Sequence, residues 1–238
     1  MRFAPAPAPY TAYDAFAGWG IHALATTRAA GSFGTASDEP ASAVLGRWDA
    51  LQQHVAAAGI DRLATARQVH GADVTEHRPG WTGWLRGGPA DGHLSVARGT
   101  ALAITVADCV PVYVAHPSGA TALLHSGWRG TVAGILARAV RALSAHGRDA
   151  CELRVLLGPA ICGRCYEVSP DVYGRLTGRA VDAPTPVDLR AVIADHARAL
   201  NITDIHVAPE CTRCDNDRHY SHRAGDTGRQ LGVLYAPG

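Results

Sequence analysis

Two histidines and one cysteine have side chains that could hold a metal ion. His70 lies in the segment Gln-Val-His-Gly, Cys109 follows Ala-Asp, and His125 opens the segment His-Ser-Gly-Trp-Arg-Gly. Each segment stands where a predicted strand gives way to a turn. Two imidazoles and a thiolate are good ligands for Zn²⁺, and three protein ligands leave the fourth tetrahedral position open for water or substrate. Because 39 and 16 residues separate the three side chains, only the fold can bring them together.

The residues beside these ligands have alternative roles that the sequence leaves open. Cys109 is either a metal ligand or a nucleophile, since a thiolate flanked by histidines has a depressed pKa. Asp108 stands in an apolar stretch, where it either orients a ligand histidine or caps a turn. Arg129 lies at the start of a predicted helix, where backbone N–H groups favour anions, so it is our first candidate for binding phosphate or substrate. Its alternative role is a surface ion pair with a carboxylate.

A second set of cysteines forms two Cys-x-x-Cys pairs. These are Cys162 with Cys165 and Cys211 with Cys214, the arrangement of a Cys₄ structural zinc site. The 45 residues between the pairs exceed the roughly 15 to 20 that are usual in a compact zinc ribbon. We therefore expect buried free thiols here and keep a second zinc as the testable alternative. The sixth cysteine, Cys151, stands alone and is predicted to lie in the core.

The composition is that of a globular protein with a large core. Of the 238 residues 47% are hydrophobic and 18% are charged, and the formal net charge of +1 supplies no long-range field for nucleic acid or an anionic membrane. Residues 1–10 lack the apolar stretch of about 7 to 15 residues that a secretory signal needs. The apolar segment 101–116 is interrupted and shorter than the roughly 20 residues of a membrane span. We expect a cytoplasmic protein with reduced thiols. All 22 basic residues are Arg, so a side-chain cation that holds phosphate is an Arg or a protonated His.

Hydrophobic periodicity predicts the elements that must position these side chains. The spacing of Val44, Leu45, Trp48, Leu51 and Val55 predicts a helix that ends at Gly59. Residues 79–89, which contain four glycines, are predicted to form a surface loop or flap, and residues 210–228 an irregular tail. Strands and helices without regular βαβ alternation favour an α+β fold in one domain. The predicted strands are 21–27, 64–70, 101–106, 110–116, 121–125, 153–157 and 205–208, and the predicted helices are 41–58, 131–145, 170–176 and 189–200.

Taken in order, the motifs closely resemble those of one known family. They are Gln-Val-His-Gly, Ala-Asp-Cys-Val-Pro-Val, His-Ser-Gly-Trp-Arg-Gly, Gly-Pro-Ala-Ile with Cys-Tyr-Glu-Val, and the late Cys-Thr, Ser-His-Arg and Thr-Gly-Arg. The chain is similar to the laccase-domain proteins, also called the polyphenol oxidase family and later described as multifunctional purine nucleoside phosphorylases. The resemblance covers about residues 23–232. The loop after Gly34 departs from it, because Thr-Ala-Ser-Asp replaces the family's usual Asn-Leu-Gly.

The resemblance implies a single-domain four-layer α/β/β/α sandwich with mixed sheets. It implies that His70, Cys109 and His125 are zinc ligands and the catalytic cluster. The implied reaction is phosphate-dependent cleavage of adenosine, inosine and 5′-methylthioadenosine, with adenosine deamination as a side activity. Together with our interpretation of the residues, it gives a candidate substrate-binding set of Asp108, Arg28, Arg47, Arg129 and Arg223.

Three hypotheses of different classes follow. The first is the zinc-dependent purine nucleoside enzyme, with a nucleoside and phosphate as its only partners, acting as a monomer or weak dimer. The second is a hydrolase that edits a peptidoglycan precursor with Cys109 as nucleophile, because some family members are described that way. The third is a non-enzymatic interaction module built on the two cysteine pairs. Copper-dependent phenol oxidation is disfavoured, because a lone His₂Cys site does not gather the four electrons that O₂ reduction requires, although copper could load adventitiously.

Overall fold

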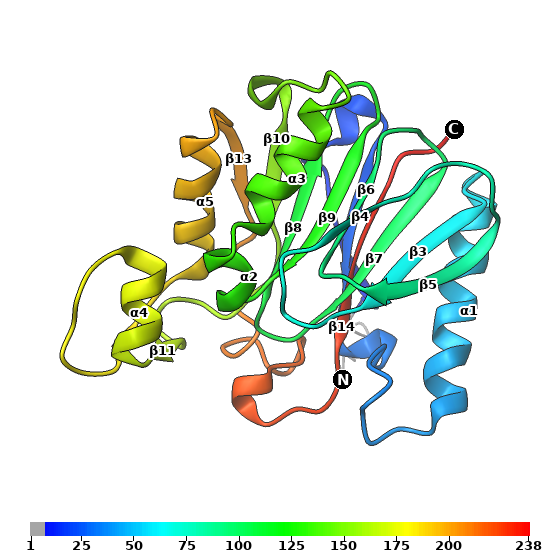
Figure 1. The fold of residues 1–238 in the computed structure, drawn as a ribbon. Helices are drawn as coiled ribbons and strands as arrows, with labels where there is room; N and C mark the ends of the chain where they lie inside the picture. The colour runs from blue at the N-terminus through cyan, green and yellow to red at the C-terminus, as the bar shows by residue number, and fades with distance from the viewer. Residues whose placement is uncertain (1–7) are drawn as a thin grey trace, which may run out of the picture.

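Two six-stranded mixed sheets form the centre of the molecule (Figure 1). The computed structural model describes residues 8–238, so most of the segment considered for a secretory signal lies outside the described residues. The first sheet has the order β1 (Tyr10–Tyr13), β2 (His22–Thr26), β14 (Gln230–Tyr235), β7 (Thr100–Val106), β3 (Arg62–Arg67) and β5 (Gly83–Pro89). The second has the order β13 (Asp204–Val207), β10 (Arg154–Leu157), β8 (Val110–Ala115), β9 (Thr121–Ser126), β6 (Gly92–Ser95) and β4 (Val74–Glu76).

Helices cover the outer faces of both sheets. Helix α1 (Ala41–Ala57) packs on the first sheet, and α3 (Ile135–Ser144) and α5 (Leu189–Ala199) pack on the second. A separate apolar cluster that includes Phe16, Leu102 and Leu123 fills the space between the sheets. The α+β, four-layer α/β/β/α sandwich is therefore confirmed. The remaining elements are α2 (Trp128–Val132), α4 (Pro170–Thr177), the ribbon of β11 (Glu167–Val168) with β12 (Thr185–Pro186), and short 3₁₀ turns at Ala17–Trp19, Arg28–Ala30, Ala150–Glu152 and His222–Ala224.

Local sequence explains the helices that were predicted well. In α1 the side chains of Val44, Trp48 and Val55 are buried and that of Leu51 is partly buried, as the spacing indicated. Leu45, which was predicted on the same face, is exposed. Helix α5 begins where the Asp188 side chain accepts hydrogen bonds from two backbone N–H groups of its first turn. Helix α4 has Pro170 in its first turn and ends at a left-handed glycine. The helices predicted over 41–58, 170–176 and 189–200 are confirmed.

The helix predicted over 131–145 is wrong as one unit. It is two helices, α2 and α3, separated at Gly134, whose φ of +74° is left-handed. The apolar stripe continues across the break, so periodicity alone does not reveal it. Helix α2 spans only five residues, which leaves little helix dipole beside Arg129.

The flap predicted over 79–89 is also wrong. Most of it is strand β5, which pairs parallel with β3 at the edge of the first sheet. Its glycines hid the strand, because strand propensity rests on side chains that pack on a pleated surface. Strand β14 follows directly after the irregular tail and lies in the middle of the first sheet. Among residues 8–238, the helices are all too short or too polar to cross a membrane.

Candidate active site

The three candidate ligands come together at one end of the two sheets. The ligand atoms of His70, Cys109 and His125 all lie within 4.8 Å of one another. His70 is exposed, Cys109 is partly buried and His125 is buried, so the cluster opens to solvent on the His70 side. The His70 and His125 rings meet edge to face with centroids 4.8 Å apart.

Strand pairing explains why residues so distant in sequence meet. Strands β8 and β9 are antiparallel, with Val110 opposite Ser126 and Pro111 opposite His125, which puts Cys109 beside the end of β9. The strand predicted over 64–70 ends at Arg67, so His70 stands in the following turn with a φ of +59°. A positive φ is uncommon for residues other than glycine and is held here by the surrounding contacts.

A buried carboxylate that sequence inspection missed organises the cluster. Asp91 accepts a hydrogen bond from Nδ1 of His125 at 2.8 Å. It also accepts three backbone N–H groups, from Val69 at 3.1 Å, His70 at 2.9 Å and Gly71 at 2.7 Å. Asp91 therefore fixes both the turn that carries His70 and the orientation of His125, so that Nε2 of His125 is the ring nitrogen on the Cys109 side of the ring.

Electrostatics at the cluster favour a thiolate on Cys109. Burial works against the charged form, but the charge of His125 and hydrogen bonds from His125 and His70 lower the pKa of Cys109 to about 6. Burial also opposes the imidazolium, yet Cys109 and Asp91 raise the pKa of His125 to about 9. Despite its burial, Asp91 has a pKa lowered to about 2 by its hydrogen bonds, first that from His125. A thiolate is the form of cysteine that both binds metals and attacks electrophiles.

Two glycines of the His-Ser-Gly-Trp-Arg-Gly motif permit the close approach of these parts. A Cβ atom at Gly127 would lie 2.8 Å from Sγ of Cys109, and one at Gly130 would lie 2.8 Å from the carbonyl oxygen of Gly71. Both distances are shorter than real Cβ contacts, so any larger residue at these positions displaces the turn that carries His70 or the thiol itself.

Asp108 ties the C-terminal tail to the cluster. Its φ is +80°, and its carboxylate accepts from Thr212 Oγ1 at 2.6 Å and from the backbone N–H of Arg223 at 2.7 Å. The carboxylate that orients a ligand histidine is Asp91. Direct contact of Asp108 with substrate stays a prediction.

Aromatic and cationic side chains surround the cluster. The guanidinium of Arg129 lies 4.4 Å from the centroid of the Trp128 ring, and that of Arg223 lies 5.2 Å from Tyr166. Burial and the charge of Cys109 raise the pKa of Tyr166 to about 12, while the charges of Arg223 and Arg129 act in the opposite direction. Tyr166 therefore lies within electrostatic reach of the cluster and of both cations.

The other two predicted substrate-binding arginines hold loops. Arg28 donates to the backbone carbonyl of Asn216 at 2.6 Å and pairs with Asp226. Arg47 donates to the carbonyl of Ser32 at 2.7 Å and pairs with Glu39. Their contact with substrate stays a prediction.

A cleft of about 220 Å³ lies next to the turn that carries His70, where Gln68, Trp84 and Arg229 contribute to its walls. The loop at Gly34 also lines this cleft, so residues that depart from the family pattern, Thr35 and Ala36, form part of its wall. The three candidate ligands are not among the residues that line it.

The structure also brings the four paired cysteines together, with their sulfur atoms within 4.8 Å of one another. They are free thiols, but of the four only Cys211 is buried, so the expectation of buried thiols is wrong for the other three. Cys151, predicted to lie in the core, is exposed, because it sits in a surface 3₁₀ turn before β10.

Comparison with known proteins places these features in a family. The chain is 33% identical to a purine nucleoside phosphorylase of Streptomyces griseus over 97% of this chain and 96% of that protein. It is 36% identical to a purine nucleoside phosphorylase of Streptomyces coelicolor over 85% and 86%. Its fold matches the crystal structure of YlmD from Geobacillus stearothermophilus with a TM-score of 0.84 and 26% identity, covering 95% and 94% of the two chains.

The family model matches over residues 26–236, which contain all three candidate ligands and all four paired cysteines. This range agrees with the extent of the resemblance expected from the motifs. The chain therefore belongs to the family described as multi-copper polyphenol oxidoreductase laccase.

Proposed function

We propose that this protein is a zinc-dependent purine nucleoside phosphorylase that acts on adenosine, inosine and 5′-methylthioadenosine, with adenosine deamination as a side activity. The observation that carries the proposal is the cluster of His70, Cys109 and His125, opened to solvent and flanked by arginines. The names of the relatives from the two Streptomyces species support the same reaction. We further expect a cytoplasmic monomer or weak dimer, with no nucleic acid or membrane partner.

The donor set fits zinc. Two imidazole nitrogens and one thiolate within 4.8 Å of one another are three of the four ligands of a tetrahedral site, and the exposed side supplies an open position. The hydrogen bond from His125 to Asp91 is the outer contact that ligating histidines usually make. When bound, zinc supplies Lewis-acid chemistry and lowers the pKa of water to about 7.

Phosphorolysis requires that an anion be held beside the nucleoside. Phosphate attacks C1′ of the sugar, the bond from C1′ to the purine nitrogen breaks, and the base leaves with a proton. The sugar product is ribose 1-phosphate from adenosine and inosine and 5-methylthioribose 1-phosphate from 5′-methylthioadenosine. Arg129 and Arg223 are the exposed cations that flank the cluster, and a guanidinium binds phosphate oxygens in a bidentate manner. The rings of Trp128 and Tyr166 are partly exposed, but guanidinium groups already lie over them, so a purine would stack beside or in place of these cations.

The test measures the release of free base and of the sugar 1-phosphate from the three nucleosides, with and without phosphate; the sugar product is ribose 1-phosphate from adenosine and inosine and 5-methylthioribose 1-phosphate from 5′-methylthioadenosine. We expect release that depends on phosphate, and ammonia from adenosine at a lower rate. Cys109→Ala should abolish both products, whereas Cys151→Ser, at an exposed cysteine far along the chain, should retain them. If the zinc-loaded wild type yields neither base nor ammonia, or if Cys109→Ala matches it, the proposal is wrong.

One observation favours a second candidate, the peptidoglycan-precursor hydrolase. The carboxylate of Asp91 orients His125, and His125 lowers the pKa of the Cys109 thiol. Enzymes that use a cysteine nucleophile with a histidine base have the same arrangement. In that reaction the thiolate would attack an amide carbonyl, the C–N bond would break and the amine would leave with a proton from the histidine. Water would then hydrolyse the thioester and release the carboxylic acid with the free thiol. A covalent adduct on Cys109 that is trapped with substrate in the presence of a chelator would favour this candidate.

The family description names copper, but the cluster is a poor fit for a multi-copper oxidase. In residues 8–238 two groups of side chains could hold a metal, and only one of them contains histidine. Reduction of O₂ to water needs four electrons, which one His₂Cys site does not store. Copper at this site is therefore expected to be adventitious.

A further inference from the structure

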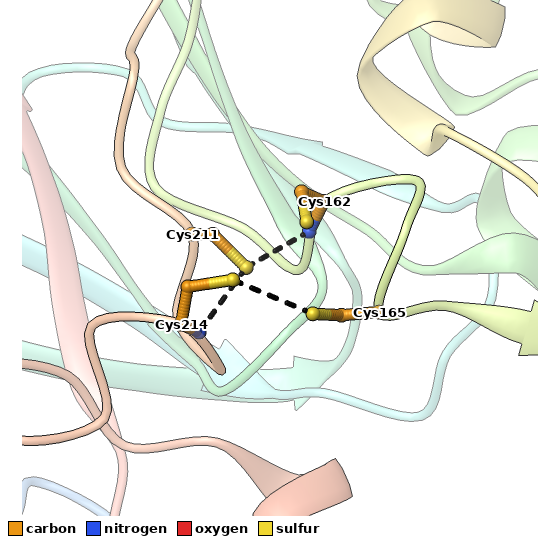
Figure 2. Close-up of side chains that lie close together, drawn as sticks. All are labelled: Cys162, Cys165, Cys211 and Cys214. Carbon is orange, nitrogen blue, oxygen red and sulfur yellow. Dashed lines mark hydrogen bonds between the residues drawn. The ribbon is translucent and has the colours of Figure 1, made fainter.

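The four paired cysteines form a compact cluster away from the histidines. Figure 2 shows the side chains of Cys162 and Cys165 on one segment facing those of Cys211 and Cys214 on another. All four sulfur atoms lie within 4.8 Å of one another, and Sγ of Cys165 is 3.5 Å from Sγ of Cys214. In a tetrahedral site with zinc–sulfur bonds of about 2.3 Å, neighbouring sulfur atoms stand about 3.8 Å apart. The observed spacing is close to that geometry.

Neighbouring parallel strands bring the two pairs together. Strands β10 and β13 are parallel neighbours, and each cysteine pair follows the carboxyl end of one of them. A bridge between Ala160 and Cys211 continues this pairing beyond the strands. The 45 residues between the pairs form the crossover that parallel strands require, so the spacing of a compact ribbon does not apply here.

Two backbone N–H groups around the cluster donate to the same sulfur atom. The N–H groups of Cys162 and Cys214 both donate to Sγ of Cys211, at 3.2 and 3.4 Å (Figure 2). Hydrogen bonds to metal-ligating atoms orient the ligands and tune the site. Cys211 is buried while Cys214 is exposed, so the cluster has one protected side and one side through which an ion can enter.

We propose that Cys162, Cys165, Cys211 and Cys214 bind a structural zinc ion, separate from the cluster of His70, Cys109 and His125. Four thiolates leave no open coordination position, which is typical of a structural site. A divalent cation also offsets the repulsion among thiolates that lie this close together. The proposal is independent of the proposed enzymatic function.

The site would fasten the two segments that hold Asp108. Ile161, next to Cys162, donates its backbone N–H to the carbonyl of Asp108 at 3.1 Å. Thr212, next to Cys211, donates its hydroxyl to the carboxylate of Asp108 at 2.6 Å. Asp108, which accepts both hydrogen bonds, directly precedes Cys109 in the chain. The zinc would thus lock the loop that carries the candidate nucleophile or ligand.

The decisive experiment isolates this site from the histidine cluster. The Cys109→Ala chain, purified with reductant and zinc, should retain one zinc per chain, and X-ray absorption should show four sulfur ligands at about 2.3 Å. Adding Cys214→Ser to Cys109→Ala should remove that zinc. Adding Cys151→Ser should not, because Cys151 is exposed and lies outside the cluster.

Three results would overturn the proposal. They are a Cys109→Ala chain without zinc under these conditions, a zinc with nitrogen or oxygen ligands, and full zinc retention after Cys214→Ser. A disulfide between Cys165 and Cys214 in the reduced preparation, found by mass spectrometry, would overturn it as well. If the double variant does not fold, the X-ray absorption spectrum of the Cys109→Ala chain still tests whether four sulfur atoms bind the zinc.

The fastening role has its own readout. Removing zinc from the Cys109→Ala chain with a chelator should increase amide hydrogen exchange in the segments around Ile161 and Thr212, and leave exchange in α1 unchanged. Unchanged exchange in both segments would contradict the fastening role while leaving the metal site in place.

Discussion

At the scale of single residues, Asp91 is the side chain on which the active-site cluster depends most. Its two oxygens accept four hydrogen bonds, one from His125 and three from the backbone of residues 69–71. In Asp91→Asn an amide NH₂ would face two of these donors. We expect zinc affinity to weaken about 10- to 100-fold and the free energy of unfolding to fall by about 1–3 kcal/mol. Zinc titration and denaturant unfolding measure the two effects.

The matched control for this change is Asp73→Asn. The Asp73 side chain is exposed and its carboxylate pairs with Arg138. An exposed pair of this kind contributes little to stability, so zinc affinity and unfolding should stay near wild type. Equal zinc affinity in Asp91→Asn and Asp73→Asn would contradict the role given to Asp91.

Gly127→Ala tests whether steric room at the thiol is essential. The φ of Gly127 is −78°, which any residue adopts, so the backbone carries no strain and the effect comes from the added methyl group. That methyl would lie 2.8 Å from Sγ of Cys109. We expect the loss of zinc binding at the cluster, with the far-ultraviolet circular dichroism unchanged. Gly46→Ala, where no atom lies within 4 Å of the new Cβ, is the control and should bind zinc as wild type does.

The cluster of candidate ligands was predicted from the sequence, whereas Asp91, which hydrogen-bonds to it, was not. His70, Cys109 and His125 stand in motifs at predicted strand ends, and their side-chain types point to metal chemistry. Asp91 is a single acidic residue between Ala90 and Gly92, and its partner His125 becomes adjacent only when β6 pairs with β9. Sequence inspection that looks for buried acids beside predicted strands could have found it, but strand β6 itself was not predicted.

At the scale of elements, Gly134 is the residue that divides α2 from α3. Its φ of +74° costs an L-residue about 1–2 kcal/mol, and a Cβ there would make only an ordinary contact at 3.9 Å. Gly134→Ala should therefore lower the melting temperature by about 2–8 °C in a chain of this size. Calorimetry measures the shift. Gly46→Ala, inside α1, should raise it, because alanine is favoured over glycine in a helix interior.

Because the helix is broken at Gly134, the two substitutions are expected to change the melting temperature in opposite directions. If residues 131–145 formed one continuous helix, Gly134→Ala would stabilise the protein as Gly46→Ala does. A rise in melting temperature for Gly134→Ala would therefore contradict the observed division into α2 and α3.

The elements that sequence patterns predicted have either an apolar stripe or a continuous apolar run. Helices α1 and α5 have a buried stripe, and the core strands β7, β8 and β9 are runs buried on both faces. Strand β5 lacks such an apolar pattern because its glycines supply no side chains. Strand β14 was not predicted because it directly follows the irregular tail. These strands complete the first sheet through pairing with distant segments, which no local pattern encodes.

At the scale of the whole molecule, the pairing of strands decides which side chains meet, whatever their separation along the chain. The two cysteine pairs seemed too far apart along the chain, yet the parallel pairing of β10 with β13 makes them neighbours. The three candidate ligands of the other cluster also come from distant segments: His125 lies in β9, His70 in the turn after β3, and Cys109 between β7 and β8. Both candidate metal sites are therefore products of the complete fold, and their binding of metal should be lost together with global unfolding.

A buried pair of histidines gives the whole molecule a pH-dependent stability. His93 lies in β6 with its Nδ1 2.9 Å from Nε2 of His77, and both side chains are buried. Burial, followed by the charge of His77, lowers the pKa of His93 to about 3, although the carboxylate of Asp91 acts in the opposite direction. Burial lowers the pKa of His77 as well. The native state therefore requires neutral rings at positions 77 and 93.

Because histidine in the unfolded chain has a pKa near 6.5, the unfolded state binds more protons than the native state between about pH 6.5 and 3. The free energy of unfolding should thus fall as the pH falls below 6.5, by up to about 1.4 kcal/mol per pH unit for each histidine. Denaturant unfolding between pH 6.5 and 4.5 measures this slope. His93→Leu removes one titrating group and should reduce the slope by about one proton, whereas His54→Gln, at an exposed position of α1, should leave it unchanged. An identical slope in wild type and His93→Leu would show that the buried pair does not set the acid sensitivity.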